Sequence, residues 1–197
     1  VSKRFGGLQA LSDVGITIQR GQVYGLIGPN GAGKTTFFNV ITGLYIPDAG
    51  SFELGGAPYK PAAVHEVAKA GIARTFQNIR LFSGLTVLEN LLVAQHNALM
   101  KASGYTVLGL LGLPAYKKAA DLAIDKARYW LEKADLVDRA DDPAGDLPYG
   151  AQRRLEICRA MCTGPELLCL DELLLVAIVR CEHLHPCGKW FGVSPTL

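Results

Sequence analysis

One nine-residue segment has the residue types and spacing needed to bind a polyphosphate. It consists of Gly28, Pro29, Asn30, Gly31, Ala32, Gly33, Lys34, Thr35 and Thr36. Glycines let successive backbone N–H groups turn inward around phosphate oxygens, and a helix that starts at the end of the segment adds its positive N-terminus. Lys34 would then reach the outer phosphates, and Thr35 would offer a hydroxyl to Mg²⁺.

The flanking sequence favours this interpretation over a glycine-rich turn that matches by chance. Val23 to Ile27 is an apolar run that predicts a strand directly before the segment, and Thr36 to Ile41 predicts a helix after it. A strand, a glycine-rich loop and a helix in that order are the context that a phosphate loop requires.

A second group of candidate residues ends another apolar run. Leu167 to Leu170 has the continuous apolar character of a strand covered on both faces, and Asp171 and Glu172 follow it. In a parallel sheet Asp171 would lie at the carboxyl end of its strand beside the phosphate loop, where it would bind Mg²⁺. Glu172 would polarise the water that attacks the terminal phosphate, while Lys34 stabilises the phosphate charge. The alternative is a strand that ends in two solvated acids.

The segments around the phosphate loop predict further short elements. Val14 to Ile18 and Ser51 to Leu54 alternate apolar with small or polar residues, which is typical of half-buried antiparallel strands. Ala62 to Ala70 predicts a short helix, and Ile72 to Phe76 predicts a strand that leads into Gln77. We therefore expect an antiparallel β layer beside an α/β core.

The middle of the chain has a helical pattern. Thr86 and Glu89 have the capping-box spacing, in which a hydroxyl and a carboxylate satisfy each other's free N–H groups. One apolar face then recurs at helical spacing: Ala119, Leu122, Ala123, Ala127, Trp130, Leu131 and Ala134. We expect a helical insert from Thr86 to about Asp138, and the loop from Asp141 to Gly145 returns the chain to the core.

Length, charge and composition narrow the possible classes of protein. The chain has 197 residues, which suits one domain with a small insert, and its net charge of +2 does not indicate nucleic acid as a partner. No apolar run approaches the ~20 residues that span a bilayer, and the N-terminus has no leader pattern. Five cysteines, all beyond residue 157, are then expected to be reduced thiols in a cytosolic protein.

An eleven-residue segment before the predicted strand that ends in Asp171 and Glu172 indicates resemblance to one particular family. It reads Leu147, Pro148, Tyr149, Gly150, Ala151, Gln152, Arg153, Arg154, Leu155, Glu156 and Ile157. The order of phosphate loop, glutamine after a strand, helical insert, LSGGQ-like signature and acidic strand resembles the ATP-binding subunit of ABC transporters, from Phe5 to Glu172. Residues 71–82 and the signature are similar to subunits that energise importers of branched-chain amino acids.

The resemblance implies a fold and its divisions. The expected class is α/β, a P-loop NTPase core with a parallel sheet, a flanking antiparallel β layer and an inserted helical subdomain, with the C-terminal part of the core missing. Residues 1–85 would form the ATP-binding core with its β layer and phosphate loop, and 86–146 the helical subdomain. Residues 147–172 would form the signature helix and the metal-binding catalytic strand, and 173–197 an atypical tail.

The resemblance also implies roles for individual residues. Phe5 would stack on adenine, although a phenylalanine at a strand end also suits a core role. Gln77 would contact Mg²⁺ and the attacking water, as a catalytic residue beside Lys34 and Glu172. The signature residues would face the γ-phosphate that a second subunit holds: Pro148, Tyr149, Gly150 and Gln152. Pro148 replaces the usual serine, so one hydroxyl to that phosphate would be absent.

The implied function is ATP hydrolysis that drives uptake of branched-chain amino acids. The cofactors would be ATP and Mg²⁺, and two ATPs would lie between two ATP-binding subunits in a homo- or heterodimer. Two membrane-spanning permeases would be the other partners, the substrate would be held by other subunits, and the chain would lie on the inner face of the cell membrane. Two alternatives stay open: a nucleotide-binding product that does not hydrolyse ATP, and a soluble ABC ATPase without a transport role.

The resemblance stops after Glu172. The chain starts at Val1 without Met, and the segment from Leu173 to Leu197 is unlike the family, as a fragment with a frame change or a misassembled end would be. We expect such a chain to keep an unpaired sheet edge, fold poorly and hydrolyse ATP weakly. Two Cys and two His lie close together between Cys181 and Cys187, but their one-residue gaps are tighter than zinc chelation favours.

Overall fold

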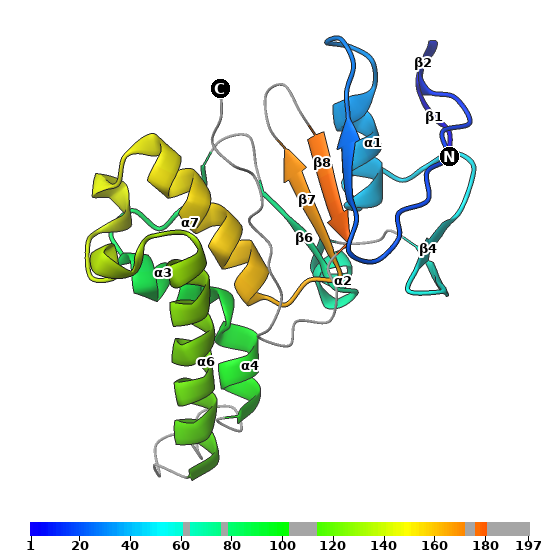
Figure 1. Cartoon of the computed structure of the whole chain (residues 1–197). Helices are drawn as coiled ribbons and strands as arrows, with labels where there is room; N and C mark the ends of the chain where they lie inside the picture. The colour runs from blue at the N-terminus through cyan, green and yellow to red at the C-terminus, as the bar shows by residue number, and fades with distance from the viewer. Residues whose placement is uncertain (61–63, 76–78, 103–113, 172–175, 181–197) are drawn as a thin grey trace. The chain divides into compact units, whose positions relative to one another are not determined.

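The chain folds into two compact units, which are described separately. The computed structural model describes residues 1–60, 64–75, 79–102, 114–171 and 176–180. The α/β unit comprises the described parts of Val1–Gln77 and Pro165–Glu182, and the helical unit comprises those of Asn78–Gly164 (Figure 1).

The centre of the α/β unit is a mixed sheet of four strands among the described residues. The strands are β3 (Val23–Leu26), β6 (Ile72–Arg74), β7 (Leu167–Asp171) and β8 (Val176–Arg180). Their order across the sheet is β3-β8-β7-β6. β6 and β7 pair in parallel, and β8 runs antiparallel to both β3 and β7. β3, β7 and β6 therefore share one direction, as the arrows of β7 and β8 in Figure 1 help to show.

Strand β8 is the main difference from the expected core. The expected parallel direction is present in β3, β7 and β6, but β8 lies between β3 and β7 and pairs with both. Its sequence, Val-Ala-Ile-Val-Arg, is rich in β-branched residues that favour an extended backbone. Residues after Glu172 were expected only to expose or cover apolar surface, which was wrong for 176–180, because β8 pairs with both β3 and β7; β3 and β6 remain the outer strands among the described residues.

Helix α1 (Lys34–Ile41) packs on this sheet through its apolar face. Phe37, Phe38, Val40 and Ile41 are buried, and they form one cluster with residues of β6 and β7. Phe38 is fully buried, a burial that contributes about 1.5–3 kcal/mol. The helix ends at Ile41 with Thr42 as its C-cap, and the expected stop residue Gly43 follows with a left-handed φ of 74°. The shorter α2 (Val64–Lys69) precedes β6.

Two antiparallel ribbons form the expected β layer, and of the two strands expected in it only Ser51 to Leu54 is present, as β4. β1 (Lys3–Phe5) pairs with β2 (Leu8–Leu11), and β4 (Phe52–Leu54) pairs with β5 (Ala57–Tyr59). β4 takes the local partner because Gly55 and Gly56, with φ values of 63° and 82°, form a two-residue turn of the type that favours hairpins.

The segment from Val14 to Ile18 is not a strand, which corrects the sequence prediction. Its alternation is nevertheless real, because Val14, Ile16 and Ile18 are half-buried and pack against the core while the residues between them are exposed. This segment and β4 both line a pocket of about 670 Å³. The period-2 pattern therefore predicted the alternating burial correctly but not the secondary structure, since Val14 exchanges backbone hydrogen bonds with Val1 outside any strand.

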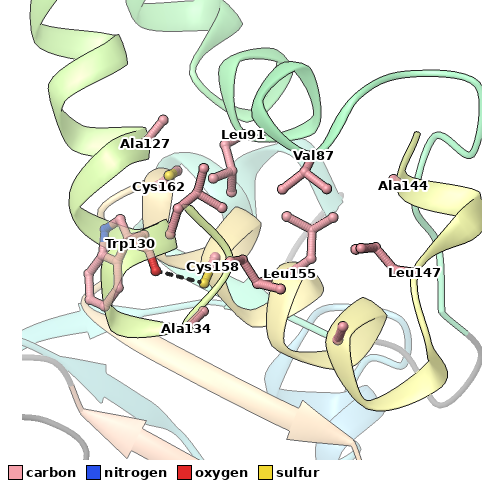
Figure 2. Packing of buried hydrophobic residues seen from close by; sticks show 13 residues of the cluster. Val87, Leu91, Ala127, Trp130, Ala134, Ala144, Leu147, Leu155, Cys158 and Cys162 are labelled. Atoms are coloured by element: carbon pink, nitrogen blue, oxygen red, sulfur yellow. Dashed lines mark hydrogen bonds between the residues drawn. The ribbon is translucent and has the colours of Figure 1, made fainter. Parts of the chain in front are cut away.

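The helical unit contains four α-helices and two 3₁₀ turns among the described residues. They are α3 (Val87–Ala94), α4 (His96–Ala102), α6 (Pro114–Lys133), η1 (Val137–Arg139), η2 (Ala144–Asp146) and α7 (Tyr149–Cys162). Side chains from α3, α6 and α7 meet in one core, with Leu91 and Leu155 fully buried (Figure 2). None of the helices in the described ranges has the length and apolar character needed to cross a membrane.

The predicted start of α3 is confirmed in atomic detail. Thr86 Oγ1 accepts a hydrogen bond from Glu89 N at 3.1 Å, and Glu89 Oε2 accepts one from Thr86 N at 2.8 Å. Asn90, which is fully buried, bonds both backbone groups of Phe82 at 3.0 Å. The loop before α3 is therefore tied to the helix by side chains that satisfy its backbone.

The predicted amphipathic helix is also confirmed as α6. Most residues of its expected apolar face are buried, including Ala127, Trp130 and Leu131. Ala119 is half-buried, and Leu122 is 60% exposed. Leu122 is separated from Ala123 by a rotation of about 100° around the helix axis, which places it at the margin of the stripe that faces α3 and α7.

Two cysteines of α7 behave as apolar core residues. Cys158 and Cys162 are each 2% exposed, and Cys158 Sγ donates to Trp130 O at 3.3 Å, the dashed line in Figure 2. Burial raises the pKa of each thiol to about 12. Neither of these two cysteines forms a disulfide.

We predict that Cys158 and Cys162 resist alkylation while the chain is folded. A thiol with a pKa of about 12 is ionised to about one part in ten thousand at pH 8, and the thiolate is the reactive form. Iodoacetamide labelling at pH 8, followed by digestion and mass spectrometry, should modify these cysteines only in denaturant. Equal labelling rates in native buffer and in denaturant would show that the helical core in Figure 2 does not form.

Candidate functional site

The glycine-rich segment forms a loop between β3 and α1, as expected. Gly31 and Gly33 have left-handed φ values of 85° and 83°, which residues with a Cβ rarely adopt. The first intrahelical bond runs from Phe37 N to Gly33 O at 2.8 Å, and no side chain caps the helix. The N–H groups of the first turn, from Lys34 to Thr36, therefore form an anion-binding end without a competing cap.

Gly33 is required for a second reason, which is a close approach of the chain to itself. A Cβ placed on Gly33 would lie 2.6 Å from Ala10 O and 3.1 Å from Leu11 Cδ2. The end of β2 thus packs directly against the start of α1, and only a residue without a side chain allows this contact.

The side chain of Lys34 lies over its own loop. Its Nζ donates to Gly28 O and to Pro29 O, the second at 2.8 Å. These contacts hold the ammonium group at the mouth of the loop, where outer phosphates would be its stronger partners because they carry charge. Ala32 N donates to Pro29 O at 3.2 Å and closes the turn.

The sheet register places Asp171 at the same edge as the phosphate loop. Leu26, the last residue of β3, and Asp171, the last residue of β7, both pair with Val176 of β8. At about 4.8 Å per strand, the two backbones lie roughly 10 Å apart in one row. β6 ends at this edge as well, because it runs parallel to β7 with Arg74 opposite Cys169.

Two predicted catalytic residues lie outside the described residues. Gln77 follows β6 by three positions, and Glu172 directly follows β7. For Asp171 the structure describes the backbone, which ends the strand as expected. The predicted cluster between Cys181 and Cys187 also lies outside the described ranges, and within them no group of three or more His, Cys, Asp or Glu could hold a metal ion.

Phe5, the predicted adenine-stacking residue, lies in β1 with a partly open ring. It is 41% exposed, and its ring meets Tyr45 edge-on at a centroid distance of 5.1 Å. Lys3 Nζ lies 5.5 Å from the same ring and donates to Asp48 Oδ1 at 2.9 Å. The hydrogen bond from Lys3 lowers the pKa of the Asp48 carboxyl. Tyr45 and Lys3 were missed by sequence reasoning, because nothing in their spacing connects them to Phe5.

The signature residues lie at the start of α7 in the helical unit. Pro148 is the N-cap residue and makes no side-chain cap, so the helix N-terminus is open. Tyr149 is 64% exposed, and its ring packs against the Arg153 guanidinium at 5.7 Å. A Cβ on Gly150 would meet no atom within 4 Å, so packing inside this chain does not require the glycine.

Gln152 has a structural partner within its own unit. Its side-chain amide donates to Leu147 O at 2.8 Å and to Gly145 O at 3.3 Å. These bonds tie the first turn of α7 to the loop before it. The structure thus brings the signature residues together, with the Gln152 side chain turned toward its own loop.

The fold and the site together define a class of protein. In this class a phosphate loop connects a strand of an α/β sheet to a helix, and a second strand ends in an acidic residue at the same edge of the sheet as the loop. Residues 11–174 match the family described as ABC transporter. The chain belongs to this family.

Individual relatives give the comparison more detail. The chain is 46% identical to the high-affinity branched-chain amino acid transport ATP-binding protein BraF of Pseudomonas aeruginosa, over 93% of this chain and 76% of BraF. It is 47% identical to the protein of the same description, LivG, of Salmonella typhimurium, over 86% of this chain and 65% of LivG. The chain thus spans about two thirds to three quarters of these relatives.

Solved structures agree with the family assignment. A nucleotide-free ATP-binding cassette from an ABC transporter matches with a TM-score of 0.63 and 32% identity, over 87% of this chain and 66% of that one. An ATP-binding cassette in its ADP conformation matches with a TM-score of 0.65 and 33% identity, over 85% and 64%. The expected α/β cassette fold is therefore confirmed.

We predict opposite effects of alanine at two of the site's glycines. Gly33→Ala should lower the free energy of unfolding by about 2 kcal/mol or more, because alanine is strained at a φ of 83° and would clash with Ala10 O. Gly150→Ala should leave it unchanged or raise it by up to about 1 kcal/mol, because the position is helical and open. Urea titration followed by circular dichroism measures both, and equal midpoints would contradict the loop geometry.

Proposed function

We propose that this chain is an ATP-binding subunit that hydrolyses ATP to drive uptake of branched-chain amino acids across a membrane. The observation that carries the proposal is the shared edge of the sheet, where the phosphate loop, the end of β7 and the end of β6 come together. The substrate class is supported by the printed descriptions of BraF and LivG.

The phosphate loop would hold the triphosphate of ATP. Backbone N–H groups of the loop and of the first turn of α1 would surround the phosphates, and Lys34 would leave its two carbonyl acceptors for phosphate oxygens. The residues Gly28, Pro29, Asn30, Gly31, Ala32, Gly33, Lys34, Thr35 and Thr36 would make up this binding set. The left-handed glycines and the uncapped helix fit a polyphosphate, since both present donors without covering them.

The acidic edge of the sheet fits a divalent cation beside the triphosphate. Thr35 would offer its hydroxyl, Asp171 its carboxylate and Gln77 its amide oxygen, which are oxygen ligands of the type that Mg²⁺ prefers. When bound, Mg²⁺ would neutralise phosphate charge during hydrolysis. Glu172 would act as the general base toward the attacking water.

The adenine would stack on Phe5. Its ring meets Tyr45 edge-on, and the residue remains 41% exposed, which supports access of a flat ligand to part of the ring. The Lys3 ammonium, which lies 5.5 Å from the centroid of this ring and is paired with Asp48, would border the stacked base.

The signature would act on ATP held by a second subunit. The α7 N-terminus has no capping side chain and Gly150 has open space around it, so a phosphate from another molecule can approach the backbone there. Pro148, Tyr149 and Gly150 would line this contact, with Gln152 supporting the turn. The partner would be a second copy or a related subunit, and the dimer would dock on two permeases at the inner face of the membrane.

We predict that Lys34→Ala reduces affinity for Mg-ATP by about tenfold or more. A hydrogen bond to a charged group contributes about 1.5–3 kcal/mol, and the variant loses the ammonium that would make one to the phosphates. Isothermal titration with ATP measures the effect, and Lys69→Ala, an exposed lysine of α2, is the matched control. Unchanged affinity in the Lys34 variant would contradict the assignment of the phosphate loop.

We also predict that Gly150→Ala weakens ATP-dependent dimerisation without weakening the monomer's affinity for ATP. The added methyl group would occupy the space through which the partner's phosphate reaches the backbone. Sedimentation velocity with a non-hydrolysable ATP analogue compares the dimer fraction with that of the wild type, and Gly84→Ala, at another glycine of the helical unit with open space around it, is the control. A Gly150 variant that dimerises like the wild type would rule out this role for the signature.

A further inference from the structure

Arg74 joins the phosphate-loop helix to the central sheet. It is the last residue of β6, and its Nη1 donates to Asn39 Oδ1 at 2.7 Å and to Thr42 Oγ1 at 3.0 Å. Its guanidinium carbon also lies 5.4 Å from the centroid of the Phe38 ring. One side chain therefore contacts three residues in the second half of α1 and at its C-cap.

The surroundings of these contacts make them strong. Phe38 is fully buried and Thr42 is 4% exposed, so water is largely excluded on the α1 side. Hydrogen bonds from a guanidinium are charge-assisted, and they gain strength where the local dielectric is low. Thr42 is itself held in orientation, because its Oγ1 donates to Phe38 O at 2.8 Å.

The Arg74 contacts connect two parts of the candidate site, the strand β7 that ends at Asp171 and the helix α1 that begins at Lys34. Arg74 pairs with Cys169 in the parallel ladder, and Thr75 N donates to Cys169 O at 2.9 Å, so Arg74 moves with β7 and its terminal Asp171. Asn39 lies five residues after Lys34, or about 7.5 Å along the helix axis. Because a helix of this length behaves as a stiff rod, holding its second half also sets the position of its first turn.

We propose that Arg74 is a positioning residue that sets the offset between the α1 N-terminus and Asp171, so that both reach one Mg²⁺ bound with the nucleotide. This inference rests on the proposed function. A residue that only fastened α1 to the sheet would affect stability alone, whereas a positioning residue affects how strongly Mg²⁺ and nucleotide support each other's binding.

The test measures ATP affinity of the whole chain with excess Mg²⁺ and with EDTA, for the wild type, Arg74→Lys and Arg74→Met. The ratio of the two affinities should fall by about fivefold or more in both variants, while the affinity in EDTA changes by less than about twofold. Lysine keeps the charge, but both hydrogen bonds come from Nη1, which lies one bond farther from Cα than a lysine Nζ does, so lysine should not restore the ratio. Arg20→Met, which changes an exposed arginine of the same unit, should leave the ratio unchanged.

Milder variants keep the proposal testable if Arg74→Met does not fold. Asn39→Ala and Thr42→Val each remove one acceptor of the arginine and should lower the ratio in the same direction, by less. An unchanged ratio in a folded Arg74→Lys variant would overturn the inference while leaving the proposed function intact. A wild-type chain that binds no ATP in either condition would overturn both.

Discussion

Burial of Phe38 and Val40 against the central sheet holds α1 in place, and the position of the phosphate loop follows from that contact. The loop itself makes few contacts, since a phosphate-binding loop must leave its N–H groups free for a ligand. Its geometry therefore depends on what holds the helix behind it. Gly33 allows β2 to press against the helix start, and Arg74 ties the other end of the helix to β6. The phosphate loop thus keeps its N–H groups exposed, while the contacts of α1 with β2 and β6 hold the loop in its conformation without a ligand.

The helical unit has its own core and does not depend on this contact. Leu91, Trp130 and Leu155 pack together with two protonated cysteines, and the capping box determines where α3 begins. Its contribution to the proposed function is the open N-terminus of α7. That end can remain open because Gln152 satisfies the backbone of the preceding loop, so the turn holds its shape without a capping side chain. Each unit therefore presents an uncapped helix N-terminus on a well-packed support.

Features that depend on neighbouring residues were predictable from the sequence. The loop between β3 and α1, the capping box of Thr86 and the strand that ends at Asp171 were each expected and each found. Features that depend on distant pairing were not. Val14 to Ile18 has the alternation of a strand but does not form one, whereas β4 pairs with β5 across two glycines. The apolar residues of β8 were expected at most to cover the sheet. Their position between β3 and β7 was not predictable, because a sequence pattern does not specify where in a sheet a strand will insert.

The sequence by itself determined the chemistry of the site, because a phosphate loop needs particular residue types at particular spacings, and those are visible without coordinates. It also determined the family, through the order of its motifs. Only the tertiary structure decided that Leu26 and Asp171 share one row of the sheet across β8, and that Arg74 links β6 to α1. The reason is physical: spacing along the chain limits local geometry, whereas the meeting of residues more than thirty positions apart depends on how the whole core packs.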